Sequence, residues 1–299
     1  MRKNLVLGGS GFVGRYFINR LLSNNQKVIN YDMKSTNIKH KNYKFIKGDI
    51  QNIDLLKKYI VKNINIYHFA GWSDVENQPD EKKILRLNYY TTKNILQISA
   101  TKKINKFIFA SSMYVLSNKG GAYRKSKVLS ENIIRDYAKK KNLDYLILRF
   151  GSVYGPGAKK GNAIFDILNS AIKKKVIKYW GTGDEIRQYI HASDASKIIY
   201  MINKRDKKLN KKTILLTGLE DTKITELFET IKEMLNLKKI KITYTKKNTS
   251  NHYIRSPYNI TSANYMNNVI CEKIIFDSYI DLGQGIYQCA QEILNKKLK

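Results

Sequence analysis

The chain has 299 residues, of which 42% are hydrophobic and 11% aromatic, with only 17 glycines and 3 prolines. This composition supports a large packed core and excludes a disordered chain. Lys and Arg number 55 against 24 Asp and Glu, a net charge of +31, but the basic residues are spread along the chain and not gathered in one arm. Charge alone is only an electrostatic footprint, so we expect solvated Lys-rich faces and no nucleic-acid partner.

The two cysteines and the N-terminal segment indicate in which cellular compartment the protein is expected. Cys271 and Cys289 form no CxxC pair and do not suggest a disulfide framework. The apolar run at residues 5–7 is too short for a signal peptide or a membrane span. We therefore expect a soluble, cytoplasmic protein with no membrane partner.

Short apolar runs alternate with amphipathic stretches through the first half of the chain. The runs predict buried strands at residues 5–7, 28–29, 43–46, 64–69, 107–110 and 145–148. Between most of them lie helical patterns, at residues 12–22, 53–61, 84–98 and 128–138. Such alternation indicates βαβ units, so we predict an α/β fold with a Rossmann-type, doubly wound parallel sheet.

The pattern loosens after Arg149. A glycine-bearing loop is expected at residues 151–161, followed by strands at 214–216 and 240–244 and helices at 224–235 and 286–298. We interpret residues 1–150 as one domain and 151–299 as a smaller C-terminal α/β lobe, with some chain crossing back to the first. The lobe would close over the carboxyl ends of the strands, where ligands bind in such folds.

Residues 8–14 read Gly-Gly-Ser-Gly-Phe-Val-Gly, between a predicted strand and a predicted helix. Gly8 permits a tight turn, Gly11 lets the backbone approach a pyrophosphate, and Gly14 lets the helix pack close to the sheet. Asp32 ends the second strand, where a carboxylate accepts the ribose hydroxyls of NAD and repels the 2′-phosphate of NADP. The sequence therefore predicts an NAD site, although Lys34 lies close to Asp32.

Tyr123 and Lys127 are four residues apart, so both project from one helix face. An ammonium beside a phenol lowers the phenol pKa from about 10 toward neutrality, which suits a general base. Five Tyr-x-x-x-Lys pairs occur, however, and only this one follows a strand that ends in Ser111-Ser112 and a Gly120-Gly121 helix start. The other four pairs are expected on solvated faces: Tyr43/Lys47, Tyr89/Lys93, Tyr137/Lys141 and Tyr200/Lys204.

With these motifs the chain resembles the extended short-chain dehydrogenases/reductases of the NAD-dependent epimerase/dehydratase family, typified by UDP-glucose 4-epimerase. Further stretches match family signatures, at residues 48–50, 68–71, 109–115, 149–156 and 187–194. The resemblance implies Ser112, Tyr123 and Lys127 as catalytic residues. It implies an NAD site formed by Gly8, Gly11, Phe12, Val13, Gly14, Asp32, Met33, Lys34, Asp49, Ile50, Phe69, Ala70, Gly71, Asn88, Ser111, Tyr123, Lys127, Phe150 and Val153.

The same resemblance implies a substrate site for a nucleotide-activated sugar. Its residues would be Trp72, Ser73, Ser152, Asn162, Arg187 and Arg255. Arg187, helped by Arg255, would bind the diphosphate, a role that suits the guanidinium fork. His191 and Asp194 are interpreted as structural and His68 as a satisfied buried histidine, and no cluster has metal-ligand spacing.

The chain departs from the family pattern in several places. Ser152 stands where many members have Asn, Gly71 and Trp72 follow Ala70 where a second alanine is common, and only 11 positions separate Ser112 from Tyr123. Dehydratases of the family usually carry a carboxylic acid just after the catalytic Ser or Thr. Here those positions are Met113 and Tyr114.

We therefore expect a 4-epimerase that works through a transient 4-keto sugar. A net 4-dehydrogenase or 4-keto-sugar reductase comes second and a 4,6-dehydratase last. A non-catalytic dinucleotide-binding regulator is the rival of another class, but such proteins typically lose the active-site Tyr or Lys. A homodimer is expected because family members pair through two helices, here residues 82–100 and 123–140, whose faces carry Ile84, Leu87, Ile95, Ile133 and Tyr137.

Overall fold

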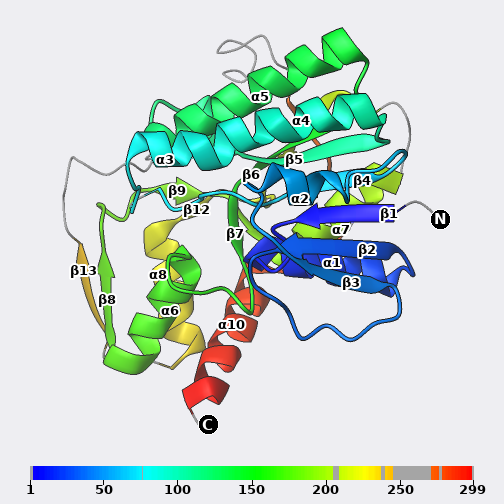
Figure 1. Cartoon of the computed structure of the whole chain (residues 1–299). Coiled ribbons are helices and arrows are strands. Elements are labelled where there is room, and N and C mark those ends of the chain that lie inside the picture. The colour runs from blue at the N-terminus through cyan, green and yellow to red at the C-terminus, as the bar shows by residue number, and fades with distance from the viewer. Residues whose placement is uncertain are drawn as a thin grey trace.

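The structure is a computed structural model, and it describes residues 3–75, 77–204, 209–236, 240–244, 271–275 and 278–297. Within these residues the chain forms a parallel sheet of eight strands (Figure 1) in the order β14-β11-β6-β5-β4-β1-β2-β3. The strands are β1 (Lys3–Leu7), β2 (Lys27–Asp32), β3 (Tyr43–Lys47), β4 (Asn65–His68), β5 (Lys106–Ser112), β6 (Tyr145–Phe150), β11 (Lys212–Leu216) and β14 (Cys271–Lys273). The strand order reverses between β1 and β4, and this switch point is where such sheets bind dinucleotides. The predicted α/β doubly wound fold is confirmed.

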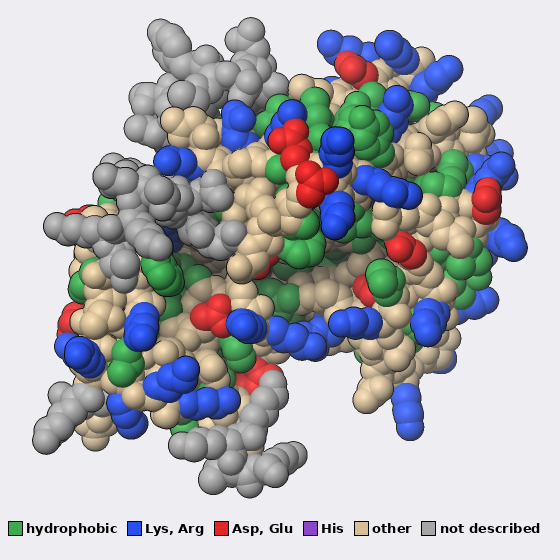
Figure 2. All heavy atoms as spheres, turned by 60° about the vertical axis from the view of Figure 1, so that its left-hand side comes forward, with side chains coloured by type: hydrophobic (Ala, Val, Ile, Leu, Met, Phe, Trp, Pro, Cys, Tyr) green, Lys and Arg blue, Asp and Glu red, His purple; other side chains and the backbone are tan. Residues whose placement is uncertain are grey.

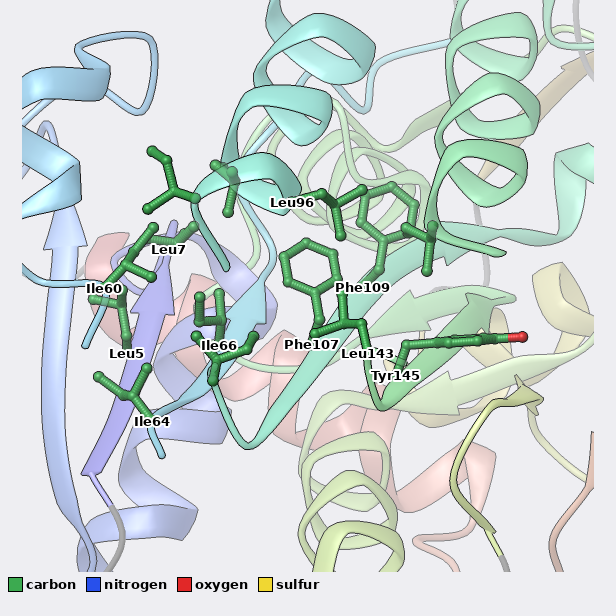
Figure 3. Packing of buried hydrophobic residues seen from close by; sticks show 14 of the residues in the cluster. Leu5, Leu7, Ile60, Ile64, Ile66, Leu96, Phe107, Phe109, Leu143 and Tyr145 are labelled. Atoms are coloured by element: carbon green, nitrogen blue, oxygen red, sulfur yellow. The ribbon is translucent and has the colours of Figure 1, made fainter. Parts of the chain in front are cut away.

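Helices cover both faces of the sheet (Figure 1). On one face lie α2 (Ile53–Lys57), α3 (Glu81–Leu85), α4 (Thr91–Lys102) and α5 (Gly121–Lys141), and on the other α1 (Phe12–Ser23) and α7 (Ala192–Lys204). Figure 3 shows the first of the two cores, where Phe107 and Phe109 of β5 face Leu96 of α4. Each such side chain stabilises the fold by about 1.5–3 kcal/mol when fully buried. These cores fix the strands whose carboxyl ends carry the predicted site.

The third core belongs to a smaller unit beside the carboxyl ends of the strands (Figure 1). It is built mainly from α6 (Ala163–Lys174), α8 (Ile224–Met234) and α10 (Leu282–Lys297), with β8 (Val176–Tyr179) and β13 (Lys241–Tyr244) paired in parallel at its edge. Two further pairs are β7 (Ser152–Tyr154) with β10 (Tyr189–His191), and β9 (Ile186–Arg187) with β12 (Thr222–Lys223). Although α7, β11 and β14 follow residue 151, they return to the large sheet.

Most predicted elements occur, with different ends. The helix expected from residue 128 begins at Gly121, so it includes both Tyr123 and Lys127. The one expected at 84–98 is instead a helical run over α3, a π-helical turn η1 (Arg86–Tyr90) and α4. The helix predicted at 53–61 ends at Lys57, and the predicted loop at 151–161 contains the short strand β7. Both α6 and α7 were missed, although their apolar residues recur at helical spacing.

The apolar face predicted for a homodimer needs correction. Ile84 and Ile95 point into the chain's own core and are 1% and 0% exposed. Leu87, Ile133 and Tyr137 are only partly buried, but they too pack against the core beneath α4 and α5. Spacing on a helix cannot tell a core-facing stripe from a partner-facing one. The homodimer itself stays a prediction.

The surface shows how the basic residues that give the chain its net positive charge are distributed. Figure 2 shows Lys and Arg side chains scattered over the face in view, with Asp and Glu among them. The pattern on this face is that of scattered solvated lysines and arginines. No helix in the described part of the chain is long and apolar enough to cross a membrane.

Candidate active site

The glycine loop at the end of β1 has the geometry that its sequence predicts. Gly8 has a φ of +78°, and a Cβ there would lie 2.6 Å from the backbone nitrogen of Ala70. A Cβ on Gly14 would lie 2.4 Å from the carbonyl oxygen of Gly8, so only glycine lets α1 start this close to the loop. Gly11 is the N-cap of α1 and has no capping side chain, and the first turn holds no acid. The cradle and the positive end of the helix dipole therefore fit a dinucleotide pyrophosphate.

Asp32, at the carboxyl end of β2, is tied to the same loop. Its Oδ2 accepts a hydrogen bond from the backbone N–H of Ser10 at 3.0 Å, and its Oδ1 accepts from the N–H of Lys34 at 3.0 Å. The carboxylate thus lies beside the glycine loop, as a ribose-binding acid must. Ser10 was not singled out from the sequence, because a serine inside a glycine motif carries no signal of its own.

The remaining predicted cofactor residues gather along the carboxyl edge of the sheet. Phe12 and Val13 are half-buried on α1, while Met33 is exposed beyond β2. At the end of β3, Asp49 accepts from the backbone N–H of Gln51 at 2.9 Å. Phe69 and Ala70 follow β4, and the backbone N–H groups of both donate to the carbonyl oxygen of Leu7 at 2.9 Å. Ile50 is buried, and Phe150 and Val153 are half-buried.

Asn88 fixes the segment that follows β4. It lies in the π-helical turn η1 and is 2% exposed. Its Oδ1 accepts from the N–H of Trp72 at 2.7 Å, and its Nδ2 donates to the Trp72 carbonyl at 3.1 Å and to Ser126 Oγ at 3.0 Å. A Cβ on Gly71, whose φ is +150°, would lie 2.7 Å from Asn88 Oδ1. Asn88 therefore holds Trp72 against the helix that carries Tyr123.

The three predicted catalytic residues lie at the end of β5 and the start of α5. Ser112 is the last residue of β5 and the N-cap of the 3-10 turn η2 (Met113–Leu116). Its hydroxyl oxygen accepts a hydrogen bond from the backbone N–H of Tyr114 at 3.3 Å. Tyr123 is 6% exposed and packs edge-on against the ring of Tyr114, with 5.9 Å between ring centroids. In each of the other four Tyr-x-x-x-Lys pairs the lysine is exposed, whereas Lys127 is buried.

Lys127 links the helix to the strand. Its Nζ donates to the carbonyl oxygen of Ala110 in β5 at 2.7 Å, and lies 4.8 Å from the ring centroid of Phe109 and 5.8 Å from that of Tyr123. Burial lowers the pKa of Lys127 to about 8, against the opposing effect of Glu131. A lysine that remains cationic below that pH, next to a buried phenol, is what a tyrosine base requires.

A buried ion pair below Lys127 was missed from the sequence. Glu131, one turn along α5, accepts from Arg149 Nε at 2.9 Å and Nη2 at 2.7 Å, and from Ser111 Oγ at 2.6 Å. Burial opposes the charge of Glu131, but the hydrogen bonds and charge of Arg149 hold its pKa below the usual range. The hydroxyl of Ser111, predicted to contact the cofactor, is engaged in this network. Only the three-dimensional fold brings Arg149 to α5, so periodicity could not show the pair.

The predicted substrate residues are held in the second unit and in the segment after β4. Arg187 lies in β9, is 9% exposed, and donates from Nη1 to the Ile186 carbonyl at 2.9 Å. Asn162 caps α6: its Oδ1 accepts from the N–H of Phe165, and its Nδ2 donates to the Val153 carbonyl at 2.8 Å. Ser152 pairs with Tyr189 between β7 and β10. Ser73 is exposed, and Arg255 lies outside the described residues.

His68 and His191 are buried, as expected for structural groups, with one departure from expectation. His68 Nε2 pairs with Thr92 Oγ1 at 3.1 Å, but its Nδ1 has no hydrogen-bond partner, so the residue is not fully satisfied. Burial, with a smaller effect of Lys127, lowers the pKa of His68 to about 3 and keeps it neutral. His191 accepts at Nδ1 from the N–H of Ser193 at 3.2 Å. Among the residues that the structure describes, no group of three His, Cys, Asp or Glu side chains could hold a metal ion.

A dinucleotide cradle, an acid at the end of β2 and a buried Tyr/Lys pair beside a serine define the class of short-chain dehydrogenases/reductases. Residues 4–216 match the family model described as the NAD dependent epimerase/dehydratase family. The chain belongs to that family, which confirms the resemblance seen in the sequence. Because the family is NAD-dependent, the predicted cofactor, NAD, is confirmed as well.

Individual relatives differ in their reactions. A putative UDP-glucose 4-epimerase of Methanocaldococcus jannaschii is 28% identical over 257 residues, which cover 78% of this chain and 83% of that protein. A dTDP-D-glucose 4,6-dehydratase of Dictyostelium discoideum is 25% identical over 232 residues, which cover 65% of this chain and 54% of that protein. The crystal structure of the UDP-glucuronic acid 4-epimerase from Bacillus cereus, in complex with UDP-glucuronic acid and NAD, matches 99% of this chain and 100% of its own with a TM-score of 0.82 at 20% identity. This last likeness shows the fold alone.

Proposed function

We propose that the protein is an NAD-dependent 4-epimerase of a nucleotide-activated sugar, which works through a transient 4-keto sugar. The observation that carries the proposal is the buried Tyr123/Lys127 pair on α5, with Lys127 bonded to the strand that ends in Ser112. We assign residues 1–150 to the NAD-binding unit and residues 151–299 to the sugar-nucleotide lobe, apart from α7, β11 and β14, which return to the sheet.

Tyr123 would act as the general base. The phenolate takes the proton of the sugar 4-hydroxyl as hydride leaves C4, and returns a proton to the keto oxygen when hydride comes back on the other face. Lys127 stabilises the phenolate, and the Ser112 hydroxyl donates a hydrogen bond to the reacting oxygen. NAD supplies the hydride acceptor and donor when it is bound.

The substrate would span both units. Arg187 and Arg255 hold the diphosphate, with Asn162 near it, while Trp72, Ser73 and Ser152 line the sugar pocket. Asp32 selects NAD over NADP by repelling a 2′-phosphate. The backbone of Trp72, fixed by Asn88 on both its N–H and its carbonyl, supports a defined sugar pocket.

The residues after Ser112 favour epimerisation over dehydration. A dehydratase needs an acid to remove water, and Met113 is 0% exposed while the ring of Tyr114 packs against that of Tyr123. Neither side chain is a carboxylic acid. A net 4-dehydrogenase or 4-keto-sugar reductase is the second candidate, because the same three catalytic residues serve it equally.

A screen of UDP- and dTDP-sugars with added NAD, followed by product NMR and absorbance of reduced nicotinamide at 340 nm, tests the proposal. An epimerase gives the C4 epimer without net NADH. Stoichiometric NADH with a released keto sugar would make the protein a dehydrogenase, and a 4-keto-6-deoxy product would make it a dehydratase. No turnover of any nucleotide sugar, with NAD bound, would leave the rival reading of a dinucleotide-binding regulator.

A further inference from the structure

The amide of Gln78, in the segment after β4, lies against the N-terminus of α5. Its Oε1 accepts a hydrogen bond from the backbone N–H of Tyr123 at 3.0 Å. Its Nε2 donates to the Gly120 carbonyl at 3.2 Å and to the Val75 carbonyl at 2.7 Å. One side chain thus joins two parts of the chain that are 45 residues apart in sequence.

The start of α5 needs such a contact. The first N–H groups of a helix have no partner within the helix, and an N-cap side chain usually accepts from one of them. Here the N-cap is Gly120, with a φ of +102°, no side-chain cap and no acid in the first turn. Gln78 therefore acts as a capping side chain that comes from another segment of the chain. The helix N–H group whose hydrogen bond it accepts is that of Tyr123.

The carbonyl of Tyr123 is tied to the same region. It accepts from Ser126 Oγ at 2.7 Å, and that oxygen in turn accepts from Asn88 Nδ2 at 3.0 Å. Asn88 also holds the backbone of Trp72. Both polar groups of the Tyr123 peptide are thus anchored to elements that follow β4, one through Gln78 and one through Asn88.

We propose that Gln78 is a positioning residue: it sets the placement of the Tyr123 phenol and couples it to the segment that carries Trp72. The inference rests on the proposed function, in which Trp72 contacts the sugar and Tyr123 removes its proton. When the sugar binds against Trp72, the hydrogen bonds of Gln78 keep the phenol of Tyr123 aligned with the sugar hydroxyl. Gln78 itself contacts neither substrate nor cofactor.

The test uses three variants of the full chain with NAD bound. Gln78→Met keeps the size of the side chain and removes both hydrogen-bonding groups. Gln78→Glu keeps an acceptor, at a helix end that favours negative charge, but loses the donors. Asn77→Ala is the matched control, because within the described residues the Asn77 side-chain amide bonds to Asp74 of the same loop and not to α5.

Two readouts are expected to agree. Gln78→Met should speed hydrogen exchange in the peptide that contains Tyr123, and should lower kcat by about 10–100-fold with KM within about threefold, because misplacement by about 1 Å can cost that much. Gln78→Glu should keep more turnover than Gln78→Met, and Asn77→Ala should match the wild type in both readouts.

If hydrogen exchange in the peptide that contains Tyr123 is unchanged in Gln78→Met, the hydrogen bond between Gln78 and Tyr123 does not hold the start of α5, whatever the substrate is. Faster exchange with a wild-type kcat, or a loss that appears in KM and not in kcat, would overturn the positioning role. Failure of the proposed function shows separately, as a wild-type enzyme that turns over no nucleotide sugar, and the exchange measurement still decides whether Gln78 holds Tyr123.

Discussion

The two sides of the proposed cleft are built in different ways. At the carboxyl edge of the sheet, the glycine loop and the predicted catalytic residues lie at the end of a strand or in the first turns of a helix, as with Gly8 after β1 and Tyr123 on α5. In the second unit, the side chains implied to bind substrate also make backbone hydrogen bonds: Asn162 caps α6 and bonds the Val153 carbonyl, and Arg187 bonds the Ile186 carbonyl.

Because of this difference, the two sides should respond differently to substitutions. A strand–turn–helix unit places its chemistry by local geometry, so a single atom can be removed from Tyr123 without moving its neighbours. In the second unit binding and folding share the same side chains, so substitutions there should affect affinity and stability together. Substitutions on the two sides should therefore separate, with the largest effect expected in turnover.

Tyr123→Phe should break the chemistry and nothing else. Turnover should fall by roughly 10²–10⁴-fold, the usual range for a positioned acid–base group, while NAD binding and KM change little. The matched control is Tyr137→Phe, the same change in another Tyr-x-x-x-Lys pair on the same helix. Steady-state kinetics on a verified substrate is the measurement, and near-normal turnover in Tyr123→Phe would show that this tyrosine is not the base.

The buried Lys127 should make the stability of the protein depend on pH. Burial lowers its pKa from 10.5 to about 8, so between these values the unfolded chain binds the proton more tightly than the folded one. The unfolding free energy of the NAD-free wild type should therefore rise relative to Lys127→Met as pH goes from 8 to 10.5, by up to about 3 kcal/mol. Below pH 8 the difference should be constant. Urea titrations at several pH values measure it, and a flat difference up to pH 10.5 would contradict the lowered pKa of the buried Lys127.

Arg187→Ala should show the opposite kinetic signature to Tyr123→Phe. Loss of charged hydrogen bonds to a diphosphate costs roughly 1.5–3 kcal/mol, so KM should rise about 10–100-fold with a smaller change in kcat. Arg187→Lys keeps the positive charge but not the guanidinium fork, so its KM should lie between those of the wild type and Arg187→Ala. A drop in kcat with unchanged KM would remove Arg187 from the binding role.

Asp32→Ala gives the smallest expected effect. The wild type should bind NAD more tightly than NADP because the carboxylate faces the 2′-phosphate, and the variant should narrow that preference by about tenfold, near the energy of one charged contact. Calorimetry with both cofactors measures the ratio, with Asp54→Ala, an exposed acid on α2, as the charge-matched control. Equal affinities in the wild type would overturn the assignment.

The same contrast explains what the sequence could and could not predict. The cradle of Gly8, Gly11 and Gly14 and the Tyr123/Lys127 pair were predictable because residues close in sequence create them. Gln78, Glu131 and Arg149 were missed because their partners lie in other elements, and pairing across a fold leaves no periodic signal. Ile84 and Ile95 were assigned to a partner surface because spacing defines a helix face without saying what covers it.

Epimerisation through a transient 4-keto sugar can be tested by following a label at C4. The enzyme is given NAD and a nucleotide sugar that carries deuterium at C4, and the products are followed by NMR. We expect the C4 epimer with deuterium still at C4, because hydride leaves and returns within one active site while Tyr123 moves only the hydroxyl proton. Deuterium that ends on the nicotinamide, or a product unchanged at C4, would contradict epimerisation through a transient 4-keto sugar.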